Sequence, residues 1–298
     1  MKTITILSGK GGVGKSSVTA SLAVLLAKKE KIVAVDCDVD ASNLALVLGV
    51  KNFENQKEIS TNEKAFVNAK AKGCKNLVDV CTFSAISWNE KKDLPEINNF
   101  LCEGCGACKL LCPRGIELKK VKNAVIGEAK TNYNFPLVFG QLKMGESGSG
   151  KVVHEVKKLA ETKNIDIMVL DSAAGIGCPV IASVQGSDYI VAVTEPNPSA
   201  LSDLKRALQI VRHFGIPYGV IINKYDLNNG FSEKIEEFMR KNKIPLLGKL
   251  PYDKKFVQAL VNLTPIVVYD KKFVQVFQSI LNNIKNYISY RPDKQYPL

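Results

Sequence analysis

The stretch GKGGVGKS, residues 9–16, decides how the chain folds. It fits the pattern of a glycine, four further residues and then Gly-Lys-Ser, which is typical of a loop that wraps around phosphate groups. Glycines let backbone N–H groups approach phosphate oxygens closely. Lys15 is expected to reach the β- and γ-phosphates of a nucleotide, and Ser16 to bind Mg²⁺. The residues expected to line the phosphates are Gly11, Gly12, Val13, Gly14, Lys15, Ser16 and Ser17.

The segments that flank this loop have the order strand, helix, strand. KTITILSG, residues 2–9, alternates threonine and isoleucine and predicts a buried strand. KSSVTASLAVLLAKK, residues 15–29, has apolar residues at helical spacing and lysines in its last turn, where they suit the helix dipole. KIVAVDCDVD, residues 31–40, predicts a second strand that ends in acids. This order indicates a parallel βαβ unit, which is the context that a phosphate loop requires.

The same alternation returns in the second half of the chain. Further strands are predicted at IDIMVLDSAAG (165–175), YIVAVTEPN (189–197), YGVIINKYD (218–226) and LLGKLPYD (246–253), with helical segments between them. These patterns predict a doubly wound α/β domain with a mostly parallel sheet, of the phosphate-loop NTPase kind. The division expected is residues 1–60 for its first part, 61–120 for an inserted small α+β domain, and 121–298 for its second part.

Composition limits the classes of protein to consider. Hydrophobic residues make up 46% of the 298 residues and charged residues 23%, as in an ordinary water-soluble globular protein. No apolar stretch approaches the roughly 20 residues that span a bilayer, and the N-terminus lacks a signal-peptide pattern. A cytoplasmic location is therefore expected. The net charge of +12 favours acidic partners, either nucleic acid or an acidic protein, although lysine-rich surfaces can also reflect general amino-acid usage.

The segment KGGVGKS, with its early Lys10, resembles the deviant Walker A motif of MinD/ParA-type ATPases. VDCDVDASNL is similar to the switch I region of that family, and VLDSAAG to its Walker B and switch II region. The resemblance implies a dimer, of two identical chains or with a related ATPase, in which Lys10 reaches the phosphates bound by the partner. It also implies that Asp38 orients the attacking water, that Asp171 holds Mg²⁺ through water, and that Ser16 and Asp38 belong to the Mg²⁺ site. Lys10, Lys15 and Asp38 are thus the expected catalytic residues.

The choice of base rests on a different stretch. NKYD, residues 223–226, imitates the Asn-Lys-x-Asp box with which GTPases read guanine. Similar strand-end pairs occur in MinD-like proteins, which bind ATP, and there Asn223 would meet adenine. The later loop, with Pro251 and Asp253, would then line the base pocket. The deviant Walker A motif favours ATP, and GTP remains the alternative.

CEGCGACKLLCP, residues 102–113, carries a second chemistry. Its spacing is that of bacterial ferredoxins, in which three close cysteines bind one cluster and the fourth, before proline, points to the other. Zinc is the alternative metal, but zinc sites usually use two separated cysteine pairs or cysteine with histidine. Six of the eight cysteines lie between residues 74 and 112. A 4Fe–4S cluster is therefore expected in the inserted domain, which we expect to be ferredoxin-like.

The stretch GCKNLVDVCTFSAI, residues 73–86, aligns with the same spacing if Cys81 takes the fourth position. The second position then falls on Cys74, while the first and third fall on Ala71 and Leu77, which bind no metal. We expect one cluster, held by Cys102, Cys105, Cys108 and Cys81. The alternative has Cys112 as the fourth ligand. Cys74 and Cys112 are then expected to be buried thiols or to hold a transient metal.

From end to end the chain resembles MinD-like ATPases with an inserted ferredoxin domain, although their insertion usually has two complete motifs. Two functions follow. In the first, a dimeric ATPase couples its nucleotide state to redox chemistry, or to the assembly or delivery of iron–sulfur or other metal cofactors. Its hydrolysis is expected to be slow without a partner, which would be a redox protein or a metal-cofactor protein. In the second, a positioning or scaffold ATPase has a structural cluster and binds DNA, membrane or a protein. The terminal segment FVQVFQSILNNIKNYI has an amphipathic face, but such faces more often pack on a core, and membrane binding is not expected.

Overall fold

The computed structural model describes residues 1–289 and divides the chain into two compact units. The larger unit comprises Met1–Gln56, Ile126–Gln141 and the described chain from Ser149 onward. The smaller unit comprises Lys57–Val125 and Leu142–Gly148. The sequence predicts that the segment from Leu142 to Gly148 belongs to the phosphate-loop domain. In the structure it packs with the smaller unit instead.

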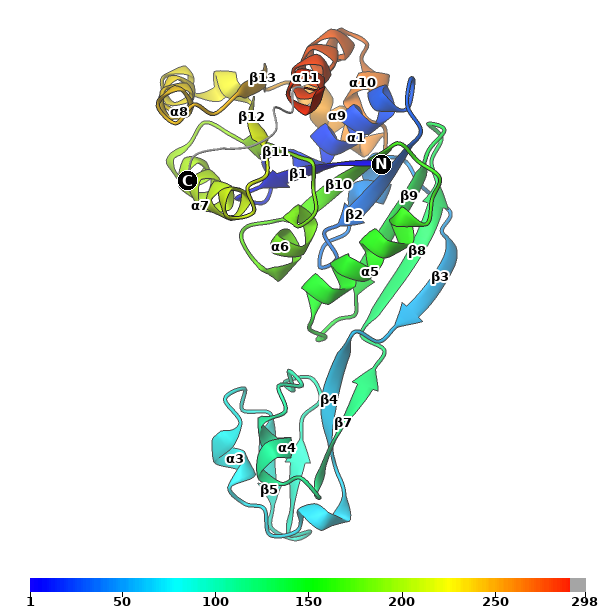
Figure 1. The fold of residues 1–298 in the computed structure, drawn as a ribbon, viewed down its shortest axis with the longest axis vertical. Helices are drawn as coiled ribbons and strands as arrows, with labels where there is room; N and C mark the ends of the chain where they lie inside the picture. The colour runs from blue at the N-terminus through cyan, green and yellow to red at the C-terminus, as the bar shows by residue number, and fades with distance from the viewer. Residues whose placement is uncertain (290–298) are drawn as a thin grey trace. The chain divides into compact units, whose positions relative to one another are not determined.

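The larger unit is built on a nine-stranded sheet with the order β13-β12-β11-β1-β10-β2-β9-β8-β3 (Figure 1). Every neighbouring pair from β13 to β9 is parallel, so the expected mostly parallel α/β fold is confirmed. The strands are β1 (Lys2–Ser8), β2 (Ile32–Cys37), β3 (Glu54–Ile59), β8 (Ala124–Lys130), β9 (Pro136–Leu142), β10 (Ile167–Ala174), β11 (Tyr189–Thr194), β12 (Tyr218–Asn223) and β13 (Leu246–Leu250).

Helices cover both faces of this sheet, which is why its central strands are buried along nearly their whole length. Successive residues of a strand point to opposite faces, so Ile6 joins one core while Leu7 joins the other. The first core includes α1 (Lys15–Leu26), α2 (Leu44–Val47), α9 (Lys254–Val261), α10 (Ile266–Tyr269) and α11 (Lys272–Ser289). The second includes α6 (Cys178–Val184), α7 (Pro198–His213) and α8 (Asn229–Lys241). Helix α5 (Ser149–Glu161) packs against α6 and β2.

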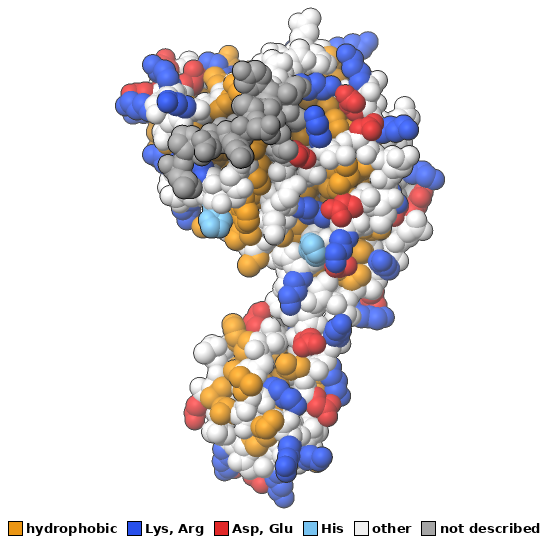
Figure 2. All heavy atoms as spheres, in the orientation of Figure 1, with side chains coloured by type: hydrophobic (Ala, Val, Ile, Leu, Met, Phe, Trp, Pro, Cys, Tyr) orange, Lys and Arg blue, Asp and Glu red, His pale blue; other side chains and the backbone are white. Residues whose placement is uncertain are grey.

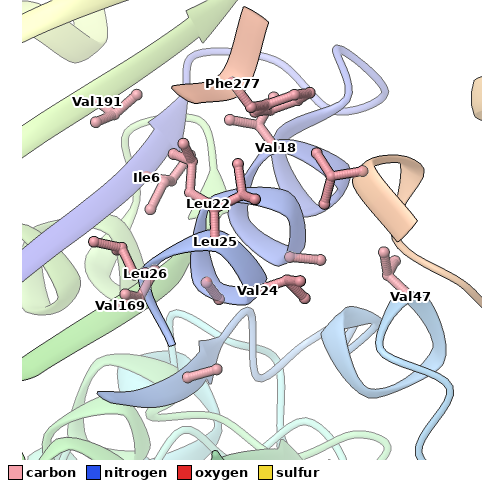
Figure 3. Packing of buried hydrophobic residues seen from close by; sticks show 14 of the residues in the cluster. Ile6, Val18, Leu22, Val24, Leu25, Leu26, Val47, Val169, Val191 and Phe277 are labelled. Carbon is pink, nitrogen blue, oxygen red and sulfur yellow. The ribbon is translucent and has the colours of Figure 1, made fainter. Parts of the chain in front are cut away.

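Helix α11 contributes to the first core with its whole apolar face. Phe273, Phe277, Ile280, Leu281 and Ile284 are each at most 2% exposed. Figure 3 shows Phe277 among the side chains that α1 and the sheet direct into this core. The amphipathic pattern at the end of the chain therefore belongs to the core. Among the described residues, no helix is both long and apolar enough to cross a membrane.

The smaller unit has two antiparallel strand pairs, β4 with β7 and β5 with β6. Its small core is made by Ala65, Ala71, Leu77, Ile86, Cys108, Cys112 and Ile116. Lys64 is only 3% exposed, lies 3.0 Å from Glu146 Oε1 and donates to the Asn99 carbonyl at 2.5 Å, so it holds the 142–148 segment within this unit. The elements are β4 (Asn62–Val67), η1 (Ala69–Ala71), α3 (Leu77–Val80), β5 (Ile86–Asn89), β6 (Leu94–Ile97), α4 (Ala107–Leu111) and β7 (Ile116–Val121).

Replacing Phe277 by alanine tests the role of α11. We expect Phe277→Ala to lower the free energy of unfolding by about 3–5 kcal/mol, because truncation leaves a cavity in a packed core. Val261, which is 76% exposed, provides the control, and Val261→Ala should stay within about 0.5 kcal/mol. Denaturant titration followed by circular dichroism measures both. Unchanged stability of Phe277→Ala together with lost vesicle binding would instead assign the helix to a membrane.

Candidate functional site

The phosphate loop joins β1 to α1 at the carboxyl edge of the parallel sheet. Gly12 and Gly14 have φ values of +79° and +92°, which side chains rarely adopt. A Cβ atom on Gly14 would also lie 2.4 Å from the amide nitrogen of Asn223. That nitrogen donates to the Val13 carbonyl at 2.7 Å and so ties the loop to the end of β12. The glycine pattern of the sequence is thus required by both backbone conformation and close packing.

Three side chains of the loop and α1 converge on the carboxylate of Asp171, near the end of β10. Lys15 Nζ lies 2.8 Å from Oδ1, Thr19 Oγ1 donates to Oδ1 at 2.7 Å, and Ser16 Oγ donates to Oδ2 at 2.6 Å. Asp171 is 1% exposed and Lys15 7%. The Lys15 nitrogen makes no well-aligned hydrogen bond within the described residues. A buried ammonium group with unused hydrogen-bond donors, next to a glycine-rich loop, is suited to bind a phosphate group.

Asp36, which the sequence reasoning missed, organises the loop that follows β2. It lies opposite Asp171 in the register of the two parallel strands. Its Oδ2 accepts hydrogen bonds from Ser42 Oγ at 2.7 Å and the Leu44 N–H at 2.9 Å, and its Oδ1 accepts one from the Asp38 N–H at 3.1 Å. Burial, with the negative charge of Asp171, raises the pKa of Asp36 to about 7. The alternating acids of VDCDVD were the available signal.

Asp38 is the residue of this loop that the sequence analysis named. It is half-buried, and burial raises its pKa above the usual range, while the positive charge of Lys15 acts in the opposite direction. The interaction with Lys15 places Asp38 in the electrostatic environment of the phosphate loop. The structure therefore brings Lys15, Ser16, Asp38 and Asp171 together at one edge of the sheet, as expected from sequence.

Glu195, at the end of β11, was not singled out from the sequence. Its Oε1 lies 3.8 Å from Lys10 Nζ and its Oε2 lies 3.0 Å from Lys224 Nζ. Lys224 also donates to the Gly12 carbonyl at 3.3 Å. Lys10 remains partly exposed, with 42% of its side chain accessible. Glu195 thus anchors both lysines near the phosphate loop. The sequence signal that could have identified it is an acidic residue directly after a buried strand.

The residues expected to meet the base lie in two neighbouring loops that have local roles of their own. Asp226 Oδ1 accepts a hydrogen bond from the Tyr252 N–H at 2.6 Å, which connects the NKYD stretch to the loop that contains Pro251. Asp253 accepts from the Lys255 N–H at 2.9 Å, as the N-cap of α9, and pairs with Lys272 at 2.6 Å. The carboxylate of Asp226 is therefore partly engaged by the backbone of the neighbouring loop.

Comparison with known proteins agrees with this geometry. The model of the CobQ/CobB/MinD/ParA nucleotide-binding domain matches residues 4–266. The chain belongs to this family. An uncharacterised protein of Methanocaldococcus jannaschii is 40% identical over 227 residues, which are 76% of this chain and 79% of the relative. The chain is therefore a nucleotide-binding ATPase of the MinD/ParA type.

Two further comparisons bear on fold and function. The septum site-determining protein MinD of Pyrococcus horikoshii, solved in complex with Mg-ADP, superposes with a TM-score of 0.60 at 20% identity, covering 98% of this chain and 99% of that one. The iron–sulfur cluster carrier protein of the same organism is 27% identical over 281 residues, 89% of this chain and 79% of the carrier. The first comparison shows the fold of the ATPase unit.

The smaller unit of this ATPase places four cysteines around one cavity. Cys81, Cys102, Cys105 and Cys108 line a small cavity that is open to solvent, together with apolar side chains such as Phe83 and Ile97. The Ala65 N–H points to Cys102 Sγ at 3.5 Å, and the Ala85 N–H to Cys81 Sγ at 3.3 Å. Within residues 1–289, no group of three or more Cys, His, Asp or Glu side chains is already close enough to hold a single metal ion.

Cys74 and Cys112 lie outside this cavity and are paired as a disulfide, with their Cα atoms 6.7 Å apart. The expectation of two separate buried thiols is therefore wrong. Cys112 is 5% exposed and Cys74 is partly exposed. The remaining two cysteines lie in the larger unit: Cys37 is buried in β2, where burial raises its pKa to about 12, and Cys178 is exposed at the start of α6.

Replacing Asp36 tests its organising role. Asp36→Ala leaves the N–H groups of Leu44 and Asp38 without their acceptor, and each unsatisfied buried group costs about 1–3 kcal/mol. We expect a lower free energy of unfolding and slower ATP hydrolysis, measured by denaturant titration and phosphate release. Asp40, an exposed acid of the same loop, is the control. Equal effects of Asp36→Ala and Asp40→Ala would contradict the role given to Asp36.

Proposed function

We propose that this ATPase carries one 4Fe–4S cluster and couples its nucleotide state to the redox state or to the assembly or delivery of iron–sulfur or other metal cofactors. The observation that supports this proposal most directly is the meeting of Cys81 with Cys102, Cys105 and Cys108 around one cavity, because these cysteines come from two separate motifs. The named function of the cluster carrier protein, matched along 89% of this chain, agrees with it.

The architecture of the smaller unit supports a ferredoxin-like origin for the insertion. Its elements follow the order β4-α3-β5-β6-α4-β7, so each half contains a strand, a helix and a strand. Cys81 directly follows α3 in the first half, and Cys112 directly follows α4 in the second. Cys81 and Cys112 thus hold corresponding positions. In two-cluster ferredoxins the cysteine at this position binds the cluster of the other half, which agrees with Cys81 facing the three-cysteine motif.

The cysteine environment fits an iron–sulfur cluster better than zinc. Four thiolates can bind the four irons of a cubane, and backbone N–H groups directed at the sulfurs of Cys81 and Cys102 favour a negatively charged cluster. Burial raises the pKa of the Cys108 thiol, with a further contribution from neighbouring Cys102, so a bound metal would favour the thiolate form of Cys108. Such a cluster would supply one-electron chemistry or serve as cargo.

In the larger unit the same geometry accounts for ATP hydrolysis. Lys15 would exchange Asp171 for the β- and γ-phosphates, and Ser16 would turn its hydroxyl to Mg²⁺, with Asp38 and Asp171 completing the metal site through water. Asp38 would also orient the attacking water. Gly11, Gly12, Val13, Gly14 and Ser17 would direct backbone or hydroxyl groups at the phosphates, while Asn223, Pro251 and Asp253 would border adenine.

Lys10 would act across a dimer, because its side chain is partly exposed and pairs loosely with Glu195 at 3.8 Å. Released from Glu195, it could neutralise charge on the phosphates bound by a second subunit, either an identical chain or a related ATPase. Electrostatic stabilisation of this kind accounts for a large share of catalysis in phosphoryl transfer.

The second candidate function is a positioning or scaffold ATPase with a structural cluster. The fold shared with a septum site-determining protein and the net charge of +12 favour it, since a basic surface attracts nucleic acid or an acidic protein. ATP-dependent binding to DNA or a protein, with a cluster that reductants do not change, would support this function over the first.

Replacing Lys10 tests the dimer. Lys10→Ala should slow ATP hydrolysis by roughly 100-fold, the usual effect of removing one transition-state charge partner, while Mg-ATP still binds. Phosphate release measures hydrolysis, calorimetry measures Mg-ATP binding, and the ATP-dependent change in molecular mass measures association. Lys29, an exposed lysine after α1, is the control. Hydrolysis and association that are unchanged in Lys10→Ala would exclude action in trans.

Metal content tests the cluster. Anaerobically reconstituted protein should hold about four irons and four sulfides per chain, with an EPR signal after dithionite. Cys81→Ala should reduce the iron content and abolish this signal, whereas Cys178→Ala, which removes an exposed thiol of the other unit, should leave both unchanged. Zinc without iron would exclude the redox function. About eight irons would mean that Cys74 and Cys112 also hold a cluster.

A further inference from the structure

The Cys74–Cys112 disulfide joins the two segments that supply the proposed cluster ligands. It links residues that are 38 positions apart in the sequence. Cys112 ends α4, and its N–H donates to the carbonyl of Cys108, a proposed ligand one helical turn earlier. On the other side, the carbonyl of Cys74 accepts from the Leu77 N–H, which begins α3, and α3 ends at Cys81. Each sulfur is thus one short helix away from a proposed ligand in its own segment.

Apart from the disulfide, these two segments meet in the small core of the unit, where Leu77 of α3 lies with Cys108 and Cys112. Its core contains few buried side chains, and two of them are the sulfur-bearing Cys108 and Cys112. Units of this size rarely bury enough apolar surface to be rigid without a crosslink or a metal. Gly73 before Cys74 has a φ of +77° with no atom within 4 Å of where its Cβ would be, so space is open beside this turn.

The two sulfurs differ in access. Cys112 is 5% exposed, and the space beside it is filled, because a Cβ atom on Gly115 would lie 2.5 Å from its sulfur. Cys74 is partly exposed and follows the open turn at Gly73. An external thiolate can therefore approach Cys74 but not Cys112. Disulfides of intracellular proteins are rare, and those that occur are commonly catalytic or redox-sensing.

We propose that the Cys74–Cys112 disulfide is a redox-sensitive crosslink that reacts with dithiols and determines how firmly Cys81 is held against the three-cysteine motif. With the bond closed, the α3 segment is fixed and a cluster is retained. With the bond open, Cys81 separates more readily and the cluster can be transferred. The second half of this inference rests on the proposed function, whereas the reactivity of the disulfide does not.

The reaction is an ordinary thiol–disulfide exchange. One thiolate of a dithiol attacks Cys74 Sγ, the Cys74–Cys112 bond breaks, and Cys112 leaves as a thiolate that takes up a proton. The second thiol of the reagent then attacks the mixed disulfide at the reagent's own sulfur and releases Cys74 as a thiol. The dithiol loses two electrons and two protons and becomes a cyclic disulfide, and the protein gains two thiols.

Trp88, the one tryptophan of the chain, reports on this segment. It lies in β5 of the smaller unit, with Lys75 Nζ 5.5 Å from its ring centroid. Lys75 directly follows Cys74 and also pairs with Glu90 at 3.3 Å. A movement of the Cys74 segment changes the charge above the indole ring. Tryptophan fluorescence therefore follows opening of the crosslink in protein that holds no cluster.

The first experiment uses the full chain without metal. Alkylation of denatured protein after mild oxidation should modify six of the eight cysteines, with peptide mapping placing the unmodified pair at Cys74 and Cys112. After treatment of the folded protein with dithiothreitol, all eight should react, and Trp88 emission should shift reversibly. The Cys74→Ser, Cys112→Ser double variant should show neither change, and Cys178→Ser should show both.

The second experiment follows loss of iron from reconstituted protein to a chelator. We expect opening of the crosslink to accelerate the loss of iron by roughly tenfold or more. A tenfold change in rate is well within the stabilisation that a disulfide closing a loop of this length usually contributes. The double variant should lose iron fast with or without dithiothreitol. Cys81→Ala provides a separate control, since it removes the proposed ligand but leaves the disulfide and the fluorescence response intact.

The outcomes separate the two proposals. Eight reactive thiols after mild oxidation, or a disulfide that dithiothreitol opens only in denaturant, would overturn the inference whatever metal binds. A reversible disulfide with an unchanged rate of iron loss would overturn its link to Cys81. A reversible disulfide in a protein that takes up no iron would support the redox-active crosslink and remove the cluster from the proposed function.

Discussion

The arrangement of the phosphate loop in the larger unit depends on the carboxylate of Asp171. A buried carboxylate is costly unless it is paired and hydrogen-bonded. Here Lys15, Ser16 and Thr19, all from the first turns of α1, satisfy it. The pairing holds the phosphate loop against β10 and brings a lysine and a hydroxyl to the place where we propose that phosphate and Mg²⁺ bind.

The neighbouring strand β2 adds a second buried acid. Asp36 lies beside Asp171 in the sheet and accepts three hydrogen bonds from the loop that contains Asp38, so two buried acids share one region with a single buried ammonium. Burial raises the pKa of Asp36, and the negative charge of Asp171 adds to this shift. A nucleotide that takes Lys15 away from Asp171 changes the balance at both acids, which gives the loop a physical reason to respond to the bound nucleotide.

The smaller unit has a small hydrophobic core, and cysteine side chains contribute to holding it together. Two of its buried side chains are cysteines, and a disulfide connects its halves where a second three-cysteine site would lie in a two-motif ferredoxin. Cys81 and Cys112, which follow equivalent helices, point to different partners: one to the cavity of the other motif and the other to Cys74. A small unit with few apolar contacts retains its arrangement best when such crosslinks are in place.

The sequence by itself determined the mostly parallel α/β fold, the ATPase family and the edge at which Lys15, Ser16, Asp38 and Asp171 meet, because a phosphate loop and the carboxyl ends of parallel strands obey short-range rules. The cluster, its ligands and the boundaries of the insertion remain predictions, although Cys81 lies at the same cavity as Cys102, Cys105 and Cys108. Only the tertiary structure revealed Asp36, the anchoring of Lys10 and Lys224 by Glu195, the burial of the α11 face, and the bond between Cys74 and Cys112. Each of these depends on groups that are distant along the chain, and their distance and burial are set by packing, which no local pattern of residues encodes.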